Sequence, residues 1–297
     1  MNANKPVGFV GLGNMGGRIT RRLVSAGHAV LGIDAVPGRA EACGATAAKG
    51  LSEIAERCDT ILLSLPDSPV VEAVVEGPAG LLAHARPGQV VVDLSTAAPA
   101  STMRLAEACA RKGAHFIDAG ISGGAAAAEK GTLTLMVGGE RERVDGLAWL
   151  FAPFATKVVH MGGSGAGHTT KLLNNFLNAV SLAATAEVMV AGKKAGLDLV
   201  RLLEVINSSS GVNFASLNRF PHIVKGDYLE GGLTGKLMTK DIALYVDRAR
   251  ELGVASLNAA GPLASFGLGT ALGYGDQISN RVVDAIGDVS GGVRLHS

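Results

Sequence analysis

One lysine and three asparagines recur at the spacing of a helix face within residues 165–196. Lys171, Asn174, Asn175 and Asn178 stand at i, i+3, i+4 and i+7, so on a helix they share one side. The rest of the segment is apolar or small, which predicts a buried helix. Buried amides and an ammonium need polar partners or a wet cavity, and burial can make a lysine a base near neutral pH. We therefore predict a cleft wall with a proton-transferring lysine; a solvated face is the alternative.

A glycine-rich stretch lies between an expected strand at 7–10 and an expected helix that ends near residue 26. It reads Gly11-Leu12-Gly13-Asn14-Met15-Gly16, which is the G-x-G-x-x-G spacing of dinucleotide-binding loops. In that motif the first glycine permits the tight turn, the second lets the backbone approach a pyrophosphate, and the third allows close packing of helix on strand. The N-terminus of the helix offers N–H groups to the phosphates. These six residues are therefore predicted to bind the cofactor.

An acid, Asp34, ends the second expected strand at 29–33. At this distance from the glycines a carboxylate accepts hydrogen bonds from the ribose hydroxyls and repels a 2′-phosphate. Asp34 therefore predicts NAD rather than NADP, although the nearby Arg39 keeps NADP as an alternative. A simple turn residue before Val36-Pro37-Gly38 is the structural alternative.

Strand and helix signals alternate through the first half of the chain. Further strands are expected at 60–64, 90–93 and 115–118, and helices at 69–76, 99–112 and 141–150. This order predicts an α/β fold with a doubly wound, mostly parallel sheet, which binds ligands at the carboxyl ends of its strands. Leu65-Pro66 and Ser95-Thr96 lie at such ends, so they are candidates for cofactor contact. The two hydroxyls are equally suited to cap a helix.

Ser122-Gly123-Gly124 follows the strand at 115–118 and precedes a short alanine-rich helix. Successive N–H groups at such a helix start form a nest that binds anions, and we expect the bound anion to be the carboxylate of the substrate. The same residues match G-x-S-x-G, the nucleophile elbow of α/β-hydrolases, so a hydrolase is an alternative. A glycine-rich phosphate loop, which a hydrolase does not need, argues against it.

The second half reads as all-helical. Helices are expected at 199–207, 237–252, 257–272 and 276–285, followed by a loose tail at 291–297. The change in pattern predicts a Rossmann domain at 1–164 and a helical domain at 165–297, joined by the long helix. Apolar helices of this kind often bury surface against a partner subunit, so a homodimer or homotetramer is expected.

Two further side chains of the second half are candidates. Lys240 lies near the start of the helix expected at 237–252, and its side chain either reaches the cofactor or lies at the surface. Phe214 follows a serine-rich turn and either lines the substrate pocket or belongs to the core.

The composition excludes several classes of protein. A net charge of +1 over 297 residues provides no electrostatic footprint for nucleic acid or an anionic membrane. Three cysteines without C-x-x-C spacing predict neither disulfides nor a zinc site, and they fit a reducing, cytoplasmic location. No apolar run is long enough to span a bilayer, and no histidine pattern predicts a metal site.

Together these motifs resemble the β-hydroxyacid dehydrogenases, the family that includes 3-hydroxyisobutyrate dehydrogenases and tartronate semialdehyde reductases. The resemblance covers nearly the whole chain, from residues 8–16 through Asp93-Leu94-Ser95-Thr96, 118–124 and the helix with Lys171 to Lys240-Asp241. It implies that Lys171 is the catalytic lysine, that Ser122, Gly123 and Gly124 clamp the substrate carboxylate, and that Asn175 contacts the substrate. Thr96 and Lys240 would lie near cofactor and substrate.

Two departures bear on the substrate. The family's usual Asp-Ala-Pro-Val-Ser-Gly-Gly has Gly120 and Ile121 in place of Pro and Val, which alters the shape of the pocket more than its chemistry. Asn178 occupies the position at which 6-phosphogluconate dehydrogenases have a glutamate, which argues against that decarboxylation, and Lys171 argues against an imine reductase.

The expected reaction is therefore the NAD-dependent interconversion of a short 3-hydroxy acid and its semialdehyde, with Lys171 as general acid and base and no metal. Reduction of an imine or of a phosphorylated sugar acid, and an NAD-sensing protein without catalysis, are the alternatives.

Overall fold

The computed structural model describes residues 5–296 of the chain. Its contacts divide the chain into two compact units, residues 1–171 and 172–297, which are described separately. The predicted domain boundary at 164 and 165 stays a prediction.

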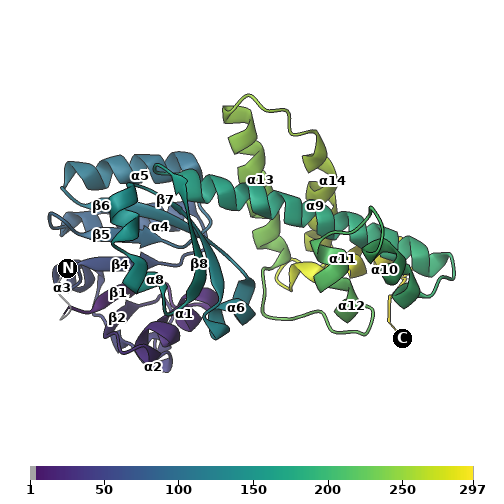
Figure 1. Ribbon diagram of the computed structural model, residues 1–297, viewed down its shortest axis with the longest axis horizontal. Helices are drawn as coiled ribbons and strands as arrows, with labels where there is room; N and C mark the ends of the chain where they lie inside the picture. The colour runs from purple at the N-terminus through teal and green to yellow at the C-terminus, as the bar shows by residue number, and fades with distance from the viewer. Residues whose placement is uncertain (1–4, 297) are drawn as a thin grey trace. The chain divides into compact units, whose positions relative to one another are not determined.

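The first unit is built on one eight-stranded sheet with the order β3-β2-β1-β4-β5-β6-β7-β8 (Figure 1). The strands are β1 (Val7–Val10), β2 (Val30–Ile33), β3 (Thr46–Ala47), β4 (Thr60–Leu63), β5 (Val90–Asp93), β6 (His115–Ser122), β7 (Leu133–Gly138) and β8 (Ala155–Gly162). All neighbouring strands are parallel except β6 and β7, which are antiparallel. The expected α/β fold with a mostly parallel sheet is confirmed.

Helices cover both faces of this sheet (Figure 1). They are α1 (Asn14–Ser25), α2 (Arg39–Ala42), α3 (Leu51–Arg57), α4 (Ser68–Glu76), a short 3₁₀ turn η1 (Leu81–Ala83), α5 (Pro99–Arg111), α6 (Gly124–Lys130), α7 (Arg141–Asp145) and α8 (Ala148–Phe151). Side chains alternate between the faces, so Leu62 packs in the core that holds Ile19 and Phe151, whereas Ile61 and Leu63 pack in the core that holds Val71. Burial on both faces explains why the strands are apolar throughout.

Two expected elements of this unit differ in extent from the prediction, and three strands were not predicted. The strand at 115–118 continues to Ser122 because it pairs with β7, and β3, β7 and β8 were not predicted. The expected helix at 141–150 is two short helices, α7 and α8. Gly146 caps α7, and the Leu147 N–H donates to the Val144 carbonyl, which tightens the turn between them.

The second unit is helical. It contains most of α9 (Ala166–Lys194), then α10 (Leu199–Asn207), α11 (Phe214–Asn218), α12 (Phe220–Ile223), α13 (Gly235–Glu251), η2 (Leu257–Ala259), α14 (Ala260–Ala271), η3 (Ser279–Arg281) and α15 (Val282–Val289). Its core gathers large side chains from several helices, including Met189, Phe220, Met238 and Phe266. The long helix is confirmed, and it ends before Gly196, whose φ of +76° suits glycine.

Two expectations for this unit need correction. The helix expected from residue 276 begins later, because Ile278 forms a β-bridge with Thr234 before η3 starts. The expected loose tail packs against the unit, since Leu295 is buried and the Tyr228 hydroxyl lies 3.1 Å from Nε2 of His296. Ser297 lies outside the described residues.

Across residues 5–296, no helix combines the length and the apolarity that crossing a membrane requires.

Candidate active site

The glycine-rich loop joins β1 to α1, and its three glycines have different surroundings. A Cβ at Gly11, where φ is +88°, would lie 2.3 Å from the Ser64 carbonyl oxygen. A Cβ at Gly16 would lie 1.9 Å from the Gly11 carbonyl oxygen. At Gly13 the nearest atom, Nη1 of the Arg39 side chain, would be 3.7 Å away, which is an ordinary van der Waals distance. Gly11 and Gly16 are therefore required by the fold, whereas Gly13 is not, and its lack of a side chain suits a ligand.

The start of α1 suits a phosphate. Gly13 is its N-cap residue and has no side chain that could cap the helix. The first N–H groups of a helix need partners, and the positive end of the helix dipole favours an anion. The loop therefore fits the pyrophosphate of a dinucleotide.

Asp34 follows β2 and holds this loop in place. Its Oδ2 accepts a hydrogen bond from the Leu12 N–H at 2.6 Å, and its Oδ1 accepts one from the Val36 N–H at 2.8 Å. Arg39 forms an ion pair with the same Oδ1 at 3.1 Å. The bond to Leu12, which the sequence did not reveal, places the carboxylate directly beside the loop. Its role toward the ribose stays a prediction.

The ends of β4 and β5 are tied together through Ser95. The Ser95 hydroxyl accepts a hydrogen bond from the Leu65 N–H at 2.9 Å, and the Ser95 N–H donates to Oδ1 of Asp93 at 2.9 Å. The N-cap position of α5 is occupied by Ala98, and not by Ser95 or Thr96. Cofactor contact by Leu65, Pro66 and Thr96 remains the prediction.

Ser122, Gly123 and Gly124 form the turn from β6 into α6. Gly123 and Gly124 have φ of +120° and +67°, a pair of positive values that suits a concave arrangement of N–H groups. Ser122 itself has no positive φ, since Leu229 is the one described non-glycine residue that does. A nucleophile elbow strains its serine, so this turn favours the anion nest over a hydrolase.

Lys171 lies against the strand that leads into this turn. A Cβ at Gly120 would lie 2.6 Å from the Cβ of Lys171, so α9 and β6 approach each other closely at this point. Gly120 is two residues before Ser122 on the same face of β6. The structure therefore brings the predicted catalytic lysine and the predicted carboxylate nest together within the first unit.

The first turn of α9 is fixed by buried polar groups that the sequence did not reveal. Asp118 accepts hydrogen bonds from the N–H groups of Gly165 and His168, each at 2.8 Å. The His168 ring bonds through Nδ1 to the Thr102 hydroxyl at 2.7 Å, and its Nε2 lies 3.9 Å from Oδ2 of Asp93. Burial raises the pKa of Asp93, and the nearby imidazole opposes that rise. These contacts position the helix that carries Lys171.

In the second unit, Asn175 is held by an acid on α13. Its Nδ2 donates to Oδ2 of Asp241 at 2.5 Å, and both side chains are buried. The Lys240 ammonium lies 3.2 Å from Oδ1 of the same carboxylate. Asp241 therefore fixes the amide of Asn175 and links it to Lys240. Sequence reasoning noted Asp241 only as part of a motif.

Phe214 begins α11 and is 59% exposed, so the core alternative was wrong. Its ring centroid lies 5.7 Å from the guanidinium carbon of Arg219. Contact with substrate stays a prediction.

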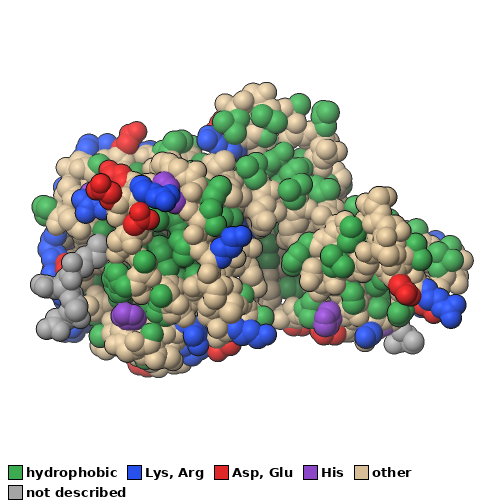
Figure 2. All heavy atoms as spheres, in the orientation of Figure 1, with side chains coloured by type: hydrophobic (Ala, Val, Ile, Leu, Met, Phe, Trp, Pro, Cys, Tyr) green, Lys and Arg blue, Asp and Glu red, His purple; other side chains and the backbone are tan. Residues whose placement is uncertain are grey.

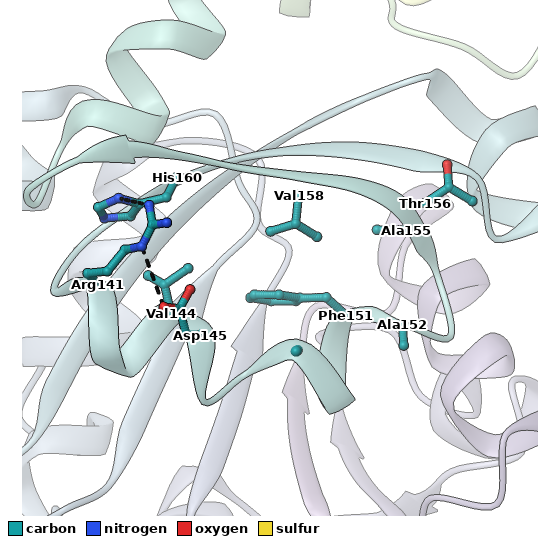
Figure 3. A pocket seen from close by; sticks show the side chains of 10 residues that line it. Arg141, Val144, Asp145, Phe151, Ala152, Ala155, Thr156, Val158 and His160 are labelled. Carbon is teal, nitrogen blue, oxygen red and sulfur yellow. Dashed lines mark hydrogen bonds and ion pairs between the residues drawn. The ribbon is translucent and has the colours of Figure 1, made fainter.

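A surface groove of about 460 Å³ lies between α7, α8 and β8 (Figure 3). Phe151 and Val158 line its middle, and Arg141 lies at one end, 3.4 Å from Nδ1 of His160. None of the predicted site residues lines this groove, so it is separate from the candidate active site.

Comparisons with known proteins cover both halves of the chain. Residues 6–163 match the family model of the NAD binding domain of 6-phosphogluconate dehydrogenase. Residues 165–282 match a second family model, which is described as NAD-binding of NADP-dependent 3-hydroxyisobutyrate dehydrogenase.

Individual relatives match over nearly their full length. The chain is 32% identical to 2-(hydroxymethyl)glutarate dehydrogenase of Eubacterium barkeri over 95% of each chain. It is 36% identical to the NAD-dependent L-serine dehydrogenase of Pseudomonas aeruginosa over 89% of this chain and 90% of that one. The structure of Mycobacterium tuberculosis 3-hydroxyisobutyrate dehydrogenase with L-serine superposes with a TM-score of 0.83 at 28% identity, covering 95% of this chain and 99% of that chain.

Proposed function

Because the chain belongs to the β-hydroxyacid dehydrogenase family, we propose that its candidate active site oxidises a short 3-hydroxy acid with Lys171 as the acid–base group. The chain is an NAD-dependent oxidoreductase that acts on hydroxy acids and interconverts them with their semialdehydes. The observation that carries the site assignment is the close approach of Lys171 to β6, two residues before Ser122.

NAD fits the loop at residues 11–16, because Gly13, the N-cap residue of α1, has no side chain, and the nearest atom to a Cβ built there, Nη1 of Arg39, lies 3.7 Å away. Asp34 would receive the ribose hydroxyls, and Leu65, Pro66, Thr96 and Lys240 are proposed to lie nearby. When bound, NAD⁺ supplies the electron acceptor for the carbon that carries the hydroxyl.

Residues of the chain bind the substrate carboxylate and transfer the proton of the hydroxyl group. The N–H groups of Ser122, Gly123 and Gly124 bind the substrate carboxylate and so fix the position of the hydroxyl group. The unprotonated amine of Lys171 takes the proton from that hydroxyl during oxidation, and its ammonium returns a proton to the aldehyde oxygen during reduction. The ammonium also stabilises negative charge on that oxygen. Asn175, whose amide is fixed by Asp241, orients the hydroxyl.

The test measures formation of reduced nicotinamide with a panel of 3-hydroxy acids, for the native chain and for Lys171→Ala. The variant is expected to lose at least about a thousandfold in kcat while it still binds NAD⁺, since proton transfer and charge stabilisation are both removed. Lys193→Ala, an exposed change near the end of the same helix, serves as the control and is expected to keep native turnover. Turnover retained by Lys171→Ala would refute the assignment.

A homodimer or homotetramer in the cytoplasm is part of the proposal. Apolar side chains such as Leu177, Leu257 and Val289 are more than 60% exposed on the helical unit, and Figure 2 shows hydrophobic side chains over the visible face of these helices. Such surface supports burial against a second subunit. Sedimentation of the purified chain tests it, and a monomer at micromolar concentration would refute it.

A further inference from the structure

A line of buried polar groups joins the ends of β4 and β5 to the first turn of α9, all within the first unit. The Leu65 N–H donates to the Ser95 hydroxyl at 2.9 Å, and the Ser95 N–H donates to Oδ1 of Asp93 at 2.9 Å. The other oxygen of Asp93 faces Nε2 of His168 at 3.9 Å, and Nδ1 of His168 lies 2.7 Å from the Thr102 hydroxyl. Every link of this line is a hydrogen bond except the one between Asp93 and His168.

The open link leaves two buried atoms unsatisfied. Asp93 and His168 are both fully buried, and neither Oδ2 nor Nε2 has a hydrogen-bond partner among residues 5–296. When the Thr102 hydroxyl donates to Nδ1 of the imidazole, the ring proton stands on Nε2 and faces the carboxylate. A movement of about 1 Å would turn this contact into a hydrogen bond and satisfy both atoms. The pair therefore has an open and a closed arrangement that differ by a small shift.

A neighbouring carboxylate favours the closed arrangement. Asp93 on β5 is the register partner of Asp118 on β6, so two buried carboxylates lie side by side. Asp118 accepts hydrogen bonds from the N–H groups of Gly165 and His168, each at 2.8 Å. Burial raises the pKa of Asp93, the imidazole of His168 opposes that rise, and Asp118 adds to it. A hydrogen bond from His168 to Oδ2 therefore stabilises the charged form of Asp93.

The first turn of α9 passes a shift of His168 on to Lys171. His168 is three residues before Lys171, so the two side chains are neighbours on the helix surface. A Cβ at Gly167 would lie 2.3 Å from the Met136 carbonyl oxygen, so the turn between them is packed tightly on β7. A Cβ at Gly120 would lie 2.6 Å from the Cβ of Lys171, so the helix is packed equally tightly on β6. With no room to adjust within the turn, a shift of His168 moves the Lys171 side chain relative to β6.

We propose that Asp93 and His168 are positioning residues, whose hydrogen bond closes when NAD⁺ binds and then seats Lys171 for proton transfer. This inference rests on the proposed function, which places NAD⁺ at the ends of β4 and β5. Ser95, which donates to Oδ1 of Asp93, is bonded to Leu65, a proposed cofactor contact. A ligand that contacts this end of the line more favourably in the closed arrangement shifts the pair toward it. Binding of the cofactor and readiness of the lysine are thereby coupled.

Two replacements of His168 separate the two nitrogens of its ring. The amide of His168→Asn takes the place of Nδ1 beside Thr102 and ends short of Asp93. The amide of His168→Gln takes the place of Nε2, so it can donate to Asp93, but it loses the bond to Thr102.

The two variants are expected to rank in opposite order in stability and in activity. His168→Asn should be the more stable in urea, yet it should lose about ten- to a hundredfold in kcat with little change in KM, because the lysine is misplaced. His168→Gln should be less stable and keep a larger kcat than His168→Asn. A loss of kcat that follows the loss of stability in both variants would show a structural role and overturn the inference.

Asp93→Asn tests the other partner. It keeps an oxygen for the Ser95 N–H but presents an amide N–H to Nε2 of His168, so kcat is expected to fall by a similar factor. Both changes break one contact, so the double variant with His168→Asn should lose no more than either single variant, and additive losses would overturn the pairing. The matched control is His222→Asn, in an exposed pair whose Nδ1 lies 3.3 Å from Asp227, and it should leave kcat and KM unchanged.

Proton NMR of the His168 ring measures the hydrogen bond without turnover and on the native chain. NAD⁺ is expected to move the Nε2 proton downfield, because a hydrogen bond to a carboxylate deshields it, and Asp93→Asn should abolish this shift. A ring proton that does not respond to bound NAD⁺ would overturn the coupling.

The outcomes also separate this inference from the proposed function. Turnover by the native chain together with native kcat in His168→Asn overturns the inference and leaves the proposed function intact. If the native chain oxidises no hydroxy acid, the proposed function fails. The response of the His168 ring proton to NAD⁺ then supports or overturns the closing of the pair by itself.

Discussion

The Thr102 hydroxyl and Nδ1 of His168 lie 2.7 Å apart and join α5 to the first turn of α9. Both side chains are at most 1% exposed, and His168 is three residues before Lys171. The other ring nitrogen of His168 and Oδ2 of Asp93 face each other at 3.9 Å, and neither has a hydrogen-bond partner among residues 5–296. The Thr102–His168 bond is thus the direct side-chain anchor of the imidazole.

Replacing this anchor should destabilise the chain and misplace the lysine. Thr102→Val leaves a buried ring nitrogen without a partner, which costs about 1–3 kcal/mol. Urea unfolding should show that loss, and kcat should fall as well. Thr170→Val is the matched control, because the Thr170 hydroxyl donates to the Ala166 carbonyl of its own helix, and the change should cost less than about 0.5 kcal/mol. Equal losses in the two variants would contradict the anchoring role.

The glycines of the loop should separate folding from cofactor binding. Gly16→Ala places a methyl group 1.9 Å from a backbone oxygen, so it should lower the Tm strongly and reduce the yield of folded protein. Gly13→Ala meets no protein atom nearer than 3.7 Å, so it should fold normally and weaken NAD⁺ binding at least tenfold. Calorimetry and cofactor titration measure the two effects. Native cofactor affinity in folded Gly13→Ala would contradict the assignment.

Cofactor choice should depend on the charge of Asp34. Asp34→Asn keeps an oxygen that can accept from the Leu12 N–H, but it removes the charge that repels a 2′-phosphate and releases Arg39 from its ion pair. The ratio of kcat/KM for NAD⁺ to that for NADP⁺ should fall by about ten- to a hundredfold, which corresponds to about 1.4–2.8 kcal/mol. Asp67→Asn is the control, because it also replaces a carboxylate that accepts a hydrogen bond from a backbone N–H, here that of Val70 at the start of α4. An unchanged ratio would contradict the proposed contact between Asp34 and the ribose of the cofactor.

Stability should decline at alkaline pH because of two buried thiols. Cys58 and Cys109 are fully buried, and burial raises the pKa of each to about 12 from 9.0. Between these values the unfolded chain binds fewer protons than the folded chain, so the free energy of unfolding falls as pH rises. The stabilising contribution is fully present below pH 9 and is lost toward pH 12, with a slope of up to about 1.4 kcal/mol per pH unit for each thiol.

Cys109→Ala tests this dependence by urea unfolding from pH 8 to 10.5. The variant should be less stable at pH 8 because it leaves a small cavity, and its stability should then decline less steeply than that of the native chain. If the free energy of unfolding declines equally steeply with pH in the variant and in the native chain, the thiol of Cys109 does not contribute to this pH dependence.

The parts of the fold that the sequence predicted correctly carry strong local signals. The glycine-rich turn, the apolar strands and the long helix α9 each have a pattern contained within one segment, and each was found at its expected place. Strand β8 was missed because it lies at an edge and mixes Thr156, Lys157 and His160 with apolar residues. Its conformation depends on pairing with β7, which no local pattern reveals.

The same distinction applies to the site. Lys171, Ser122 and Asn175 could be proposed from the sequence because they lie in short motifs. Thr102–His168 and Asn175–Asp241 each join residues 66 positions apart, so only the folded chain reveals them.

The two ends of the sheet resist further pairing. Strand β3 has only two residues, and β8 carries the exposed Lys157 and two irregularities in its register with β7. Short edge strands, bulges and edge lysines hinder the addition of a strand from another molecule. Self-association through a continuous intermolecular sheet is therefore disfavoured, and subunits of this chain would have to join through side chains of their helices.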